Sequence, residues 1–136
     1  MCIRDRYYGY HRNTLLAVEA VPRFVTLHPP DWAFAKADLE NSVTSWTKAI
    51  VINTPGNPSG KVFSRAELEC IAEFAERHDL FVFTDEIYEH FLYDDRTHLS
   101  PALIAGMADR TITISGFSKT FSTVSYTHLD VYKRQQ

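Results

Sequence analysis

Cysteine is scarce in this sequence and long apolar runs are absent. Of its 136 residues only Cys2 and Cys70 are cysteines, too few for a disulfide framework and without the spacing of a zinc site. Apolar stretches such as residues 49–52 and 80–83 fall far short of the roughly 20 residues that a bilayer helix needs. We therefore expect no disulfide-stapled domain and no membrane span, and we expect a reducing compartment, the cytoplasm.

The chain also lacks a basic cluster. Lysine and arginine number 14 against 17 aspartate and glutamate residues, for a net charge of -3. This balance argues against a nucleic-acid or anionic-membrane partner. The six histidines have no metal-site spacing, so no metal is predicted. What the chain does have is 45% hydrophobic residues, enough for a packed core.

The two ends look foreign to the rest of the chain. Residues 1–6 are basic but lead into no apolar run, so they are not a secretion signal. Residues 1–6 and 130–135 back-translate to the same nucleotide string in different frames, and that string resembles a sequencing-library adapter. We expect residues 1–6 and 124–136 to be translated adapter, and residues 7–123 to be a stretch of protein with neither natural end.

Within that stretch, apolar periodicity predicts helices alternating with strands. The predicted helices cover residues 12–20, 36–43, 64–79 and 101–107, and the predicted strands cover 23–27, 49–52, 80–84 and 111–115. Ser64 and Glu67 have the spacing of a capping box. The alternation predicts an α/β fold with a parallel sheet, and the continuous apolar run of residues 49–52 predicts a strand that is buried on both faces.

Polar side chains follow three of the predicted strands. Asn57 follows the first of these strands, Asp85 the second, and Ser118 with Lys119 the third. Each alone has a simpler interpretation, as a turn, a helix cap or a surface lysine. Because ligands of parallel sheets bind beyond the carboxyl ends of the strands, the combination points to a binding site.

Three segments carry a family resemblance: Asn57-Pro58-Ser59-Gly60, Thr84-Asp85-Glu86-Ile87-Tyr88 and Ser115-Gly116-Phe117-Ser118-Lys119-Thr120-Phe121-Ser122. In order and spacing they closely resemble the class I/II aminotransferases, which are pyridoxal-phosphate enzymes of fold type I. The resemblance covers residues 7–123. It implies a three-layer α/β/α fold with a mostly parallel sheet, of which this chain holds an incomplete, central part of the large cofactor-binding domain.

The resemblance implies a role for each polar residue at the strand ends. Lys119 would hold pyridoxal 5'-phosphate as a Schiff base and, once released, move the α-proton of the substrate. Asp85 would keep the pyridine nitrogen protonated. Tyr88, placed on the same side of a helix that starts after Asp85, would share with Asn57 the hydrogen bonding of the ring's phenolic oxygen.

Two serines are implied as phosphate ligands. Ser118 would donate to the cofactor phosphate, and Ser115 is a weaker candidate for the same role. The family has a phosphate-binding arginine where this chain has Thr127, inside the adapter-like tail. The family's glycine-rich phosphate loop and its substrate-binding arginine belong to segments that this sequence does not contain.

The implied reaction is transamination between an amino acid and a 2-oxo acid, in a homodimer. Two other reactions, elimination at the β-carbon (C-S lyase chemistry) and decarboxylation, would use the same four residues, Asn57, Asp85, Tyr88 and Lys119. A cofactor-binding effector domain of a transcription regulator would also keep Lys119. We expect the 136 residues alone to be inactive.

Overall fold

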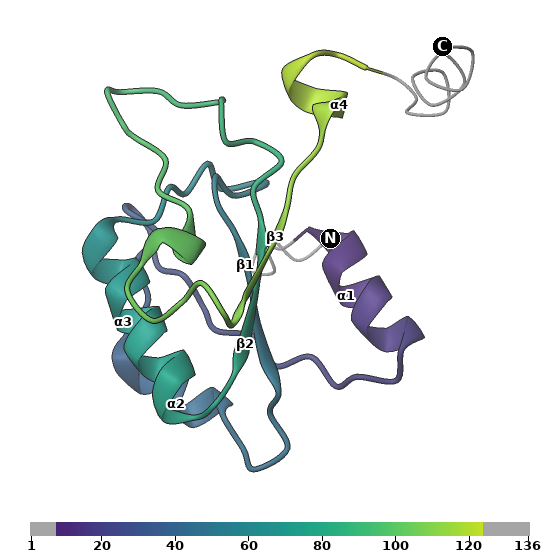
Figure 1. Cartoon of the computed structure of the whole chain (residues 1–136), viewed down its shortest axis with the longest axis vertical. Helices are drawn as coiled ribbons and strands as arrows, with labels where there is room; N and C mark the ends of the chain where they lie inside the picture. The colour runs from purple at the N-terminus through teal and green to yellow at the C-terminus, as the bar shows by residue number, and fades with distance from the viewer. Residues whose placement is uncertain (1–7, 124–136) are drawn as a thin grey trace.

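Three short strands form one parallel sheet in the computed structural model, which describes residues 8–123. Strand β1 (Ala49–Asn53) pairs with β2 (Phe81–Asp85), and β2 pairs with β3 (Thr111–Ile114). Helices lie on both sides of this sheet (Figure 1). The predicted α/β architecture with a parallel sheet is confirmed. The adapter-like segments and Thr127 lie outside the described residues.

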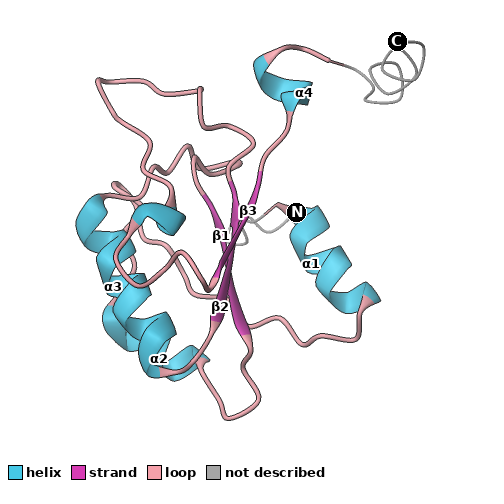
Figure 2. Ribbon diagram, in the orientation of Figure 1, coloured by secondary structure: helices cyan, strands magenta, loops and turns pink. Residues whose placement is uncertain are grey.

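The helices surround the sheet unevenly. Helices α2 (Lys36–Ser42) and α3 (Arg65–Arg77) lie on one side, and α1 (Gly9–Ala17) lies on the other (Figure 2). A 3-10 turn, η1 (Pro101–Leu103), precedes β3, and the short α4 (Phe117–Thr120) follows it. Within residues 8–123 no helix is long and apolar enough to cross a membrane.

Helix α1 ends earlier than the predicted 12–20. Glu19 adopts a left-handed φ of 60°, which stops the helix. The Glu19 amide then donates to the Leu16 carbonyl at 3.0 Å and the Ala20 amide to the Leu15 carbonyl at 2.9 Å. These two bonds are the pattern of a Schellman motif, with glutamate in the place usually taken by glycine. Apolar periodicity alone does not reveal such a stop.

The predicted strand over residues 23–27 is wrong. Val25 and Leu27 pack against the core as their alternation indicated, but the segment joins no ladder. Its nearest approach to pairing is an isolated bridge, in which the His28 amide donates to the Ala33 carbonyl at 2.8 Å. Alternation reports a half-buried extended segment, and it carries no information about a pairing partner.

The capping box predicted at the start of α3 is confirmed. The Ser64 hydroxyl accepts from the Glu67 amide at 3.3 Å, and the Glu67 carboxylate accepts from the Ser64 amide at 2.8 Å. The same carboxylate pairs with the Lys61 ammonium at 2.6 Å, and Lys61 is only 6% exposed. Helix α3 packs against the sheet through its apolar stripe, whose buried residues are Leu68, Ile71, Ala72, Phe74 and Ala75.

Only one face of the sheet is covered, contrary to the prediction that its strands are buried on both faces. Ile52 and Val82, which face α3, are 4% and 0% exposed. Side chains on the other face are open to solvent, with Phe81 at 53% and Ile114 at 50%. The physical reason is that α1, the helix on that side, buries none of its own residues.

The open apolar face of the sheet predicts how the 136-residue chain behaves when it is expressed alone. We expect the 136 residues to aggregate through it, because exposed apolar patches and sheet edges associate. Replacing Phe81 and Ile112 by lysine is expected to raise the monomeric fraction in size-exclusion chromatography. The matched control is Val82→Lys on the covered face, which is expected to abolish folding. Equal solubility of the original chain and the double variant would contradict the account.

Candidate cofactor site at the carboxyl edge of the sheet

The parallel register brings the carboxyl ends of the three strands together. Asn53 at the end of β1 lies opposite Asp85 at the end of β2, and Asp85 lies opposite Ile114 at the end of β3. The polar residues that follow each strand therefore emerge at one edge of the sheet.

The turn after β1 is held in a shape that positions Asn57. The Asn53 side chain accepts from the Asn57 amide at 2.6 Å and donates to the Asp85 carbonyl at 3.0 Å. Gly56 lies so close to its surroundings that a Cβ atom there would come within 3.2 Å of the Asn53 carbonyl oxygen. The turn is thus tied to both β1 and β2, and Asn57 projects from a fixed backbone.

Asn57, Tyr88 and Lys119 lie close to one another in the structure. The Asn57 Nδ2 donates to the Tyr88 hydroxyl oxygen at 3.3 Å. The Lys119 Nζ lies 5.9 Å from the centre of the Tyr88 ring. Tyr88 stands in a turn after β2 instead of the predicted helix start. The Asp85 carboxylate accepts from the Ile87 amide at 3.2 Å, which forms an Asx turn.

Asn57 and Tyr88 each keep one hydrogen-bond donor that could bind an oxygen atom of a ligand. Asn57 keeps a second amide hydrogen, and Tyr88 keeps its hydroxyl hydrogen, because its oxygen serves as the acceptor from Asn57. The Lys119 side chain is exposed on α4. One acceptor atom could therefore receive hydrogen bonds from both the amide and the phenol, beside a primary amine.

Asp85 is held by a residue that sequence reasoning missed. The His11 Nε2 donates to the Asp85 carboxylate at 2.8 Å, and the Asp85 side chain is 15% exposed. His11 comes from α1, on the side of the sheet that the other helices leave open (Figure 1). The two residues lie 74 positions apart, so no local spacing signal could have paired them.

The two serines have different surroundings. The Ser115 hydroxyl donates to the Glu89 carboxylate at 2.9 Å. A serine has one hydroxyl hydrogen, so this bond uses the group that would donate to a phosphate, and it also places a negative charge beside it. Ser118 is half-buried in α4 and remains the stronger candidate of the two. Both assignments stay predictions.

Glu86 sits behind the site and closes the loop that carries Tyr88. It is 2% exposed, and its carboxylate accepts from the His98 Nε2 at 2.6 Å and from the Ser100 hydroxyl at 2.7 Å. Burial alone would raise the pKa of the Glu86 carboxyl, but the hydrogen bonds from His98 and Ser100 hold this pKa below its ordinary value. The charged form of Glu86 therefore stabilises the fold.

We expect Glu86→Gln to lower the free energy of unfolding at neutral pH by about 1–3 kcal/mol, because charge-assisted hydrogen bonds are lost. A lowered pKa in the folded state gives stability that is full above the ordinary value of 4.5 and is lost as pH falls through the folded pKa. The difference in free energy of unfolding between the original protein and Glu86→Gln should therefore disappear as the pH falls into the acid range. Urea unfolding at a series of pH values measures it.

The control for this prediction is Glu73→Gln, since the Glu73 side chain is 75% exposed. It should leave stability within about 0.5 kcal/mol at every pH. A stability difference between the original protein and Glu86→Gln that stays constant down to about pH 3.5 would contradict the lowered pKa of Glu86.

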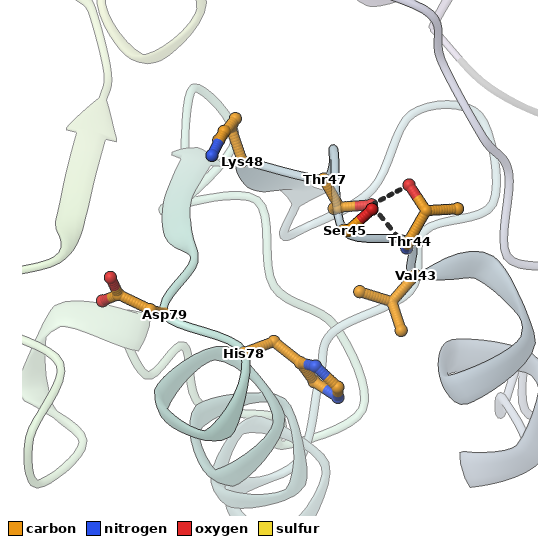
Figure 3. Close-up of a pocket in the computed structure, with 7 residues that line it drawn as sticks. All are labelled: Val43, Thr44, Ser45, Thr47, Lys48, His78 and Asp79. Atoms are coloured by element: carbon orange, nitrogen blue, oxygen red, sulfur yellow. Dashed lines mark hydrogen bonds between the residues drawn. The ribbon is translucent and has the colours of Figure 1, made fainter.

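Two cavities lie at opposite edges of the sheet. One, of about 440 Å³, is formed by residues that precede β1 and β2, among them Thr44, Thr47 and His78 (Figure 3). None of the predicted site residues lines it. The other, of about 530 Å³, has Asn57 and Tyr88 in its wall. The chemistry-bearing residues thus share their edge of the sheet with the second cavity.

Comparison with known proteins gives a consistent result. A family model described as aminotransferase class I and II matches residues 2–125. Aspartate aminotransferase of Pyrococcus abyssi is 53% identical over 89 residues, which are 65% of this chain and 23% of that protein. Kynurenine--oxoglutarate transaminase 1 of Rattus norvegicus is 41% identical over 128 residues, covering 86% of this chain and 30% of the relative.

Solved structures agree with the sequence relatives. N-succinyldiaminopimelate aminotransferase from Mycobacterium tuberculosis superposes with a TM-score of 0.81 at 41% identity, over 86% of this chain and 31% of that one. A Thermus thermophilus aspartate aminotransferase double mutant gives a TM-score of 0.79 at 33% identity, over 86% and 30%. The chain spans less than a third of the length of these proteins.

Proposed function

This chain belongs to the class I and II aminotransferases, and we propose that it forms the cofactor-binding part of an enzyme that transfers an amino group between an amino acid and a 2-oxo acid. The observation that carries the proposal is the meeting of Asn57, Tyr88 and Lys119 beside Asp85 at one sheet edge. The relatives are named as an aminotransferase and a transaminase, and these names favour amino transfer over elimination or decarboxylation.

The residues present fit pyridoxal 5'-phosphate. Its ring nitrogen needs an anionic partner, and Asp85 offers a carboxylate that is mostly shielded from water. Its phenolic oxygen needs hydrogen-bond donors, and Asn57 and Tyr88 have two to spare. Its aldehyde needs a primary amine, which Lys119 supplies.

When bound, the cofactor supplies an electron-accepting ring at the α-carbon of the substrate. The remaining steps of binding, orientation and proton transfer are carried out by side chains of this chain. Asp85 holds a proton on the ring nitrogen, and His11 orients Asp85 through its 2.8 Å hydrogen bond. Asn57 and Tyr88 hold the phenolic oxygen, and the Lys119 Nζ takes up and returns the α-proton.

Several parts of the proposal concern the whole protein. Amino acid and 2-oxo acid substrates, a homodimer and a cytoplasmic location stay predictions. So does the need for further segments, which the family uses for the phosphate and the substrate carboxylate.

In the full-length enzyme, we expect Lys119→Ala to abolish covalent attachment of the cofactor and to slow amino transfer by about a thousandfold, because it removes the proton-transferring base. Borohydride reduction followed by mass spectrometry locates the modified lysine. Lys48→Ala is the control, since Lys48 lies at the opposite edge of the sheet. Modification of another lysine, or unchanged turnover in Lys119→Ala, would overturn the proposed function.

A second prediction concerns His11. We expect His11→Phe to weaken cofactor binding by about 5- to 20-fold, since a hydrogen bond to a partly buried carboxylate is lost. His11→Gln, which keeps a donor, should restore part of the affinity. The control His90→Phe removes an imidazole that is 63% exposed and should change nothing. Equal affinities for His11→Phe and the original protein would show that Asp85 needs no support from α1.

A further inference from the structure

Lys61 is the one buried cation among residues 8–123. Its side chain is 7% exposed, whereas every other lysine and arginine in this range is at least partly open to solvent. Lys61 is not among the residues that the proposed site uses directly. Because a buried charge is costly unless it is paired and hydrogen-bonded, its position requires partners that compensate the charge.

The ammonium group of Lys61 joins three segments of the chain. Its Nζ donates to the Glu67 carboxylate at 2.6 Å and to the Asp31 backbone carbonyl at 3.1 Å. It also lies 5.4 Å from the centre of the Phe63 ring, and Phe63 belongs to the hydrophobic core. Lys61 is thereby fixed to the start of α3, to the loop that contains Asp31 and to the core beside it.

Glu67 provides Lys61 with a full negative charge. One oxygen of its carboxylate accepts from Lys61, and the other accepts from the Ser64 amide at 2.8 Å. Partial burial would raise the pKa of the Glu67 carboxyl, but the hydrogen bonds from Lys61 and Ser64 hold this pKa below its ordinary value of 4.5. A glutamine at this position would also complete the capping box, so the cap alone does not require the charge.

The backbone of Lys61 closes the turn that carries Asn57. The Lys61 carbonyl accepts from the Gly56 amide at 2.8 Å, and the Gly56 carbonyl accepts from the Gly60 amide at 2.8 Å. The Lys61 amide donates to the Ser59 hydroxyl at 3.2 Å. Asn57 follows Gly56 directly and lies inside this closed turn, so a shift of the backbone at Lys61 also moves Asn57.

We infer that the buried ion pair of Lys61 and Glu67 positions Asn57, by fixing the backbone of the turn that holds the Asn57 amide group against the Tyr88 hydroxyl. Lys61 is therefore assigned as a positioning residue that acts through Asn57. The inference rests on the proposed function, because the hydrogen bond that it supports is the one from Asn57 to the phenolic oxygen of the cofactor.

The first test needs no cofactor. Hydrogen exchange of the amides of residues 56–60 is measured by mass spectrometry on the full-length apoprotein. We expect Lys61→Met to speed this exchange by about tenfold, because the acceptor of the Gly56 amide is no longer fixed. Unchanged exchange in Lys61→Met overturns the inference, whatever reaction the protein catalyses.

The matched control for this measurement is Lys36→Met. Lys36 also pairs with a glutamate, Glu73, but the two side chains are 74% and 75% exposed. Because exposed ion pairs contribute little, this variant should leave exchange of residues 56–60 within about twofold. An equal rise in both lysine variants overturns the assignment to the buried pair.

The second test uses the absorbance of the bound cofactor. A hydrogen bond donated to its phenolic oxygen stabilises negative charge there and makes the neighbouring proton easier to lose. We expect Lys61→Met to raise the pH midpoint of the visible absorbance by about half a pH unit, since this hydrogen bond is weakened. In the Asn57→Ala background, Lys61→Met should shift the midpoint no further, because the group that it positions is gone. A general loss of stability would not produce this dependence on Asn57.

Two further variants keep the test decisive if Lys61→Met folds poorly. The double variant Lys61→Met with Glu67→Gln removes both charges and keeps an acceptor for the capping box, so we expect it to fold and to show the raised midpoint. Lys61→Arg keeps the positive charge and should recover part of the original midpoint. An original midpoint in the double variant overturns the inference.

The outcomes separate this inference from the proposed function. If the original protein shows no absorbance from a cofactor bound at Lys119, the proposed function fails and this inference fails with it. If that absorbance is present but Lys61→Met keeps the original midpoint, or shifts it equally with and without Asn57, only the assignment of Lys61 fails.

Discussion

Parallel pairing of β1, β2 and β3 is the constraint on which the site depends. It sends the carboxyl ends of all three strands to one edge, with Asn53 opposite Asp85 and Asp85 opposite Ile114. Side chains that are about 30 residues apart in the chain are thereby brought within hydrogen-bonding distance, as Asn57 and Tyr88 are. The register also decides which face each residue takes: Glu86 points toward the covered side and closes a loop, whereas Asp85 is reached by α1 from the other.

The two faces of the sheet are covered unevenly. Helix α3 buries its apolar stripe against one face, while Phe81 and Ile114 stay open on the other. The matched part makes up less than a third of the relatives' length, so their further segments have room to cover that face and Lys119. The local geometry at the strand ends, by contrast, depends on hydrogen bonds among residues 53–87 of this chain.

Much of the fold could be predicted because its signals are local. The capping box of Ser64 and Glu67 and the stripe of α3 are written within a few residues. Failures came where the deciding contact is distant or conformational: residues 23–27 alternate but have no partner strand, and Glu19 stops α1 with a left-handed φ. For the candidate site, the strand ends predicted that Asn57, Asp85 and Lys119 lie at one edge of the sheet, and their roles stay predictions. His11 escaped because its partner is 74 residues away.

The central claim is that Asp85 serves the cofactor's ring nitrogen while Asn57, Tyr88 and Lys119 serve its other groups. The most direct measurement is nitrogen NMR of the full-length protein loaded with pyridoxal phosphate that is labelled with ¹⁵N in the ring. The account predicts a protonated ring nitrogen that loses its proton in Asp85→Ala and keeps it in Glu89→Gln. A ring nitrogen with the same chemical shift in the original protein and in Asp85→Ala would contradict it.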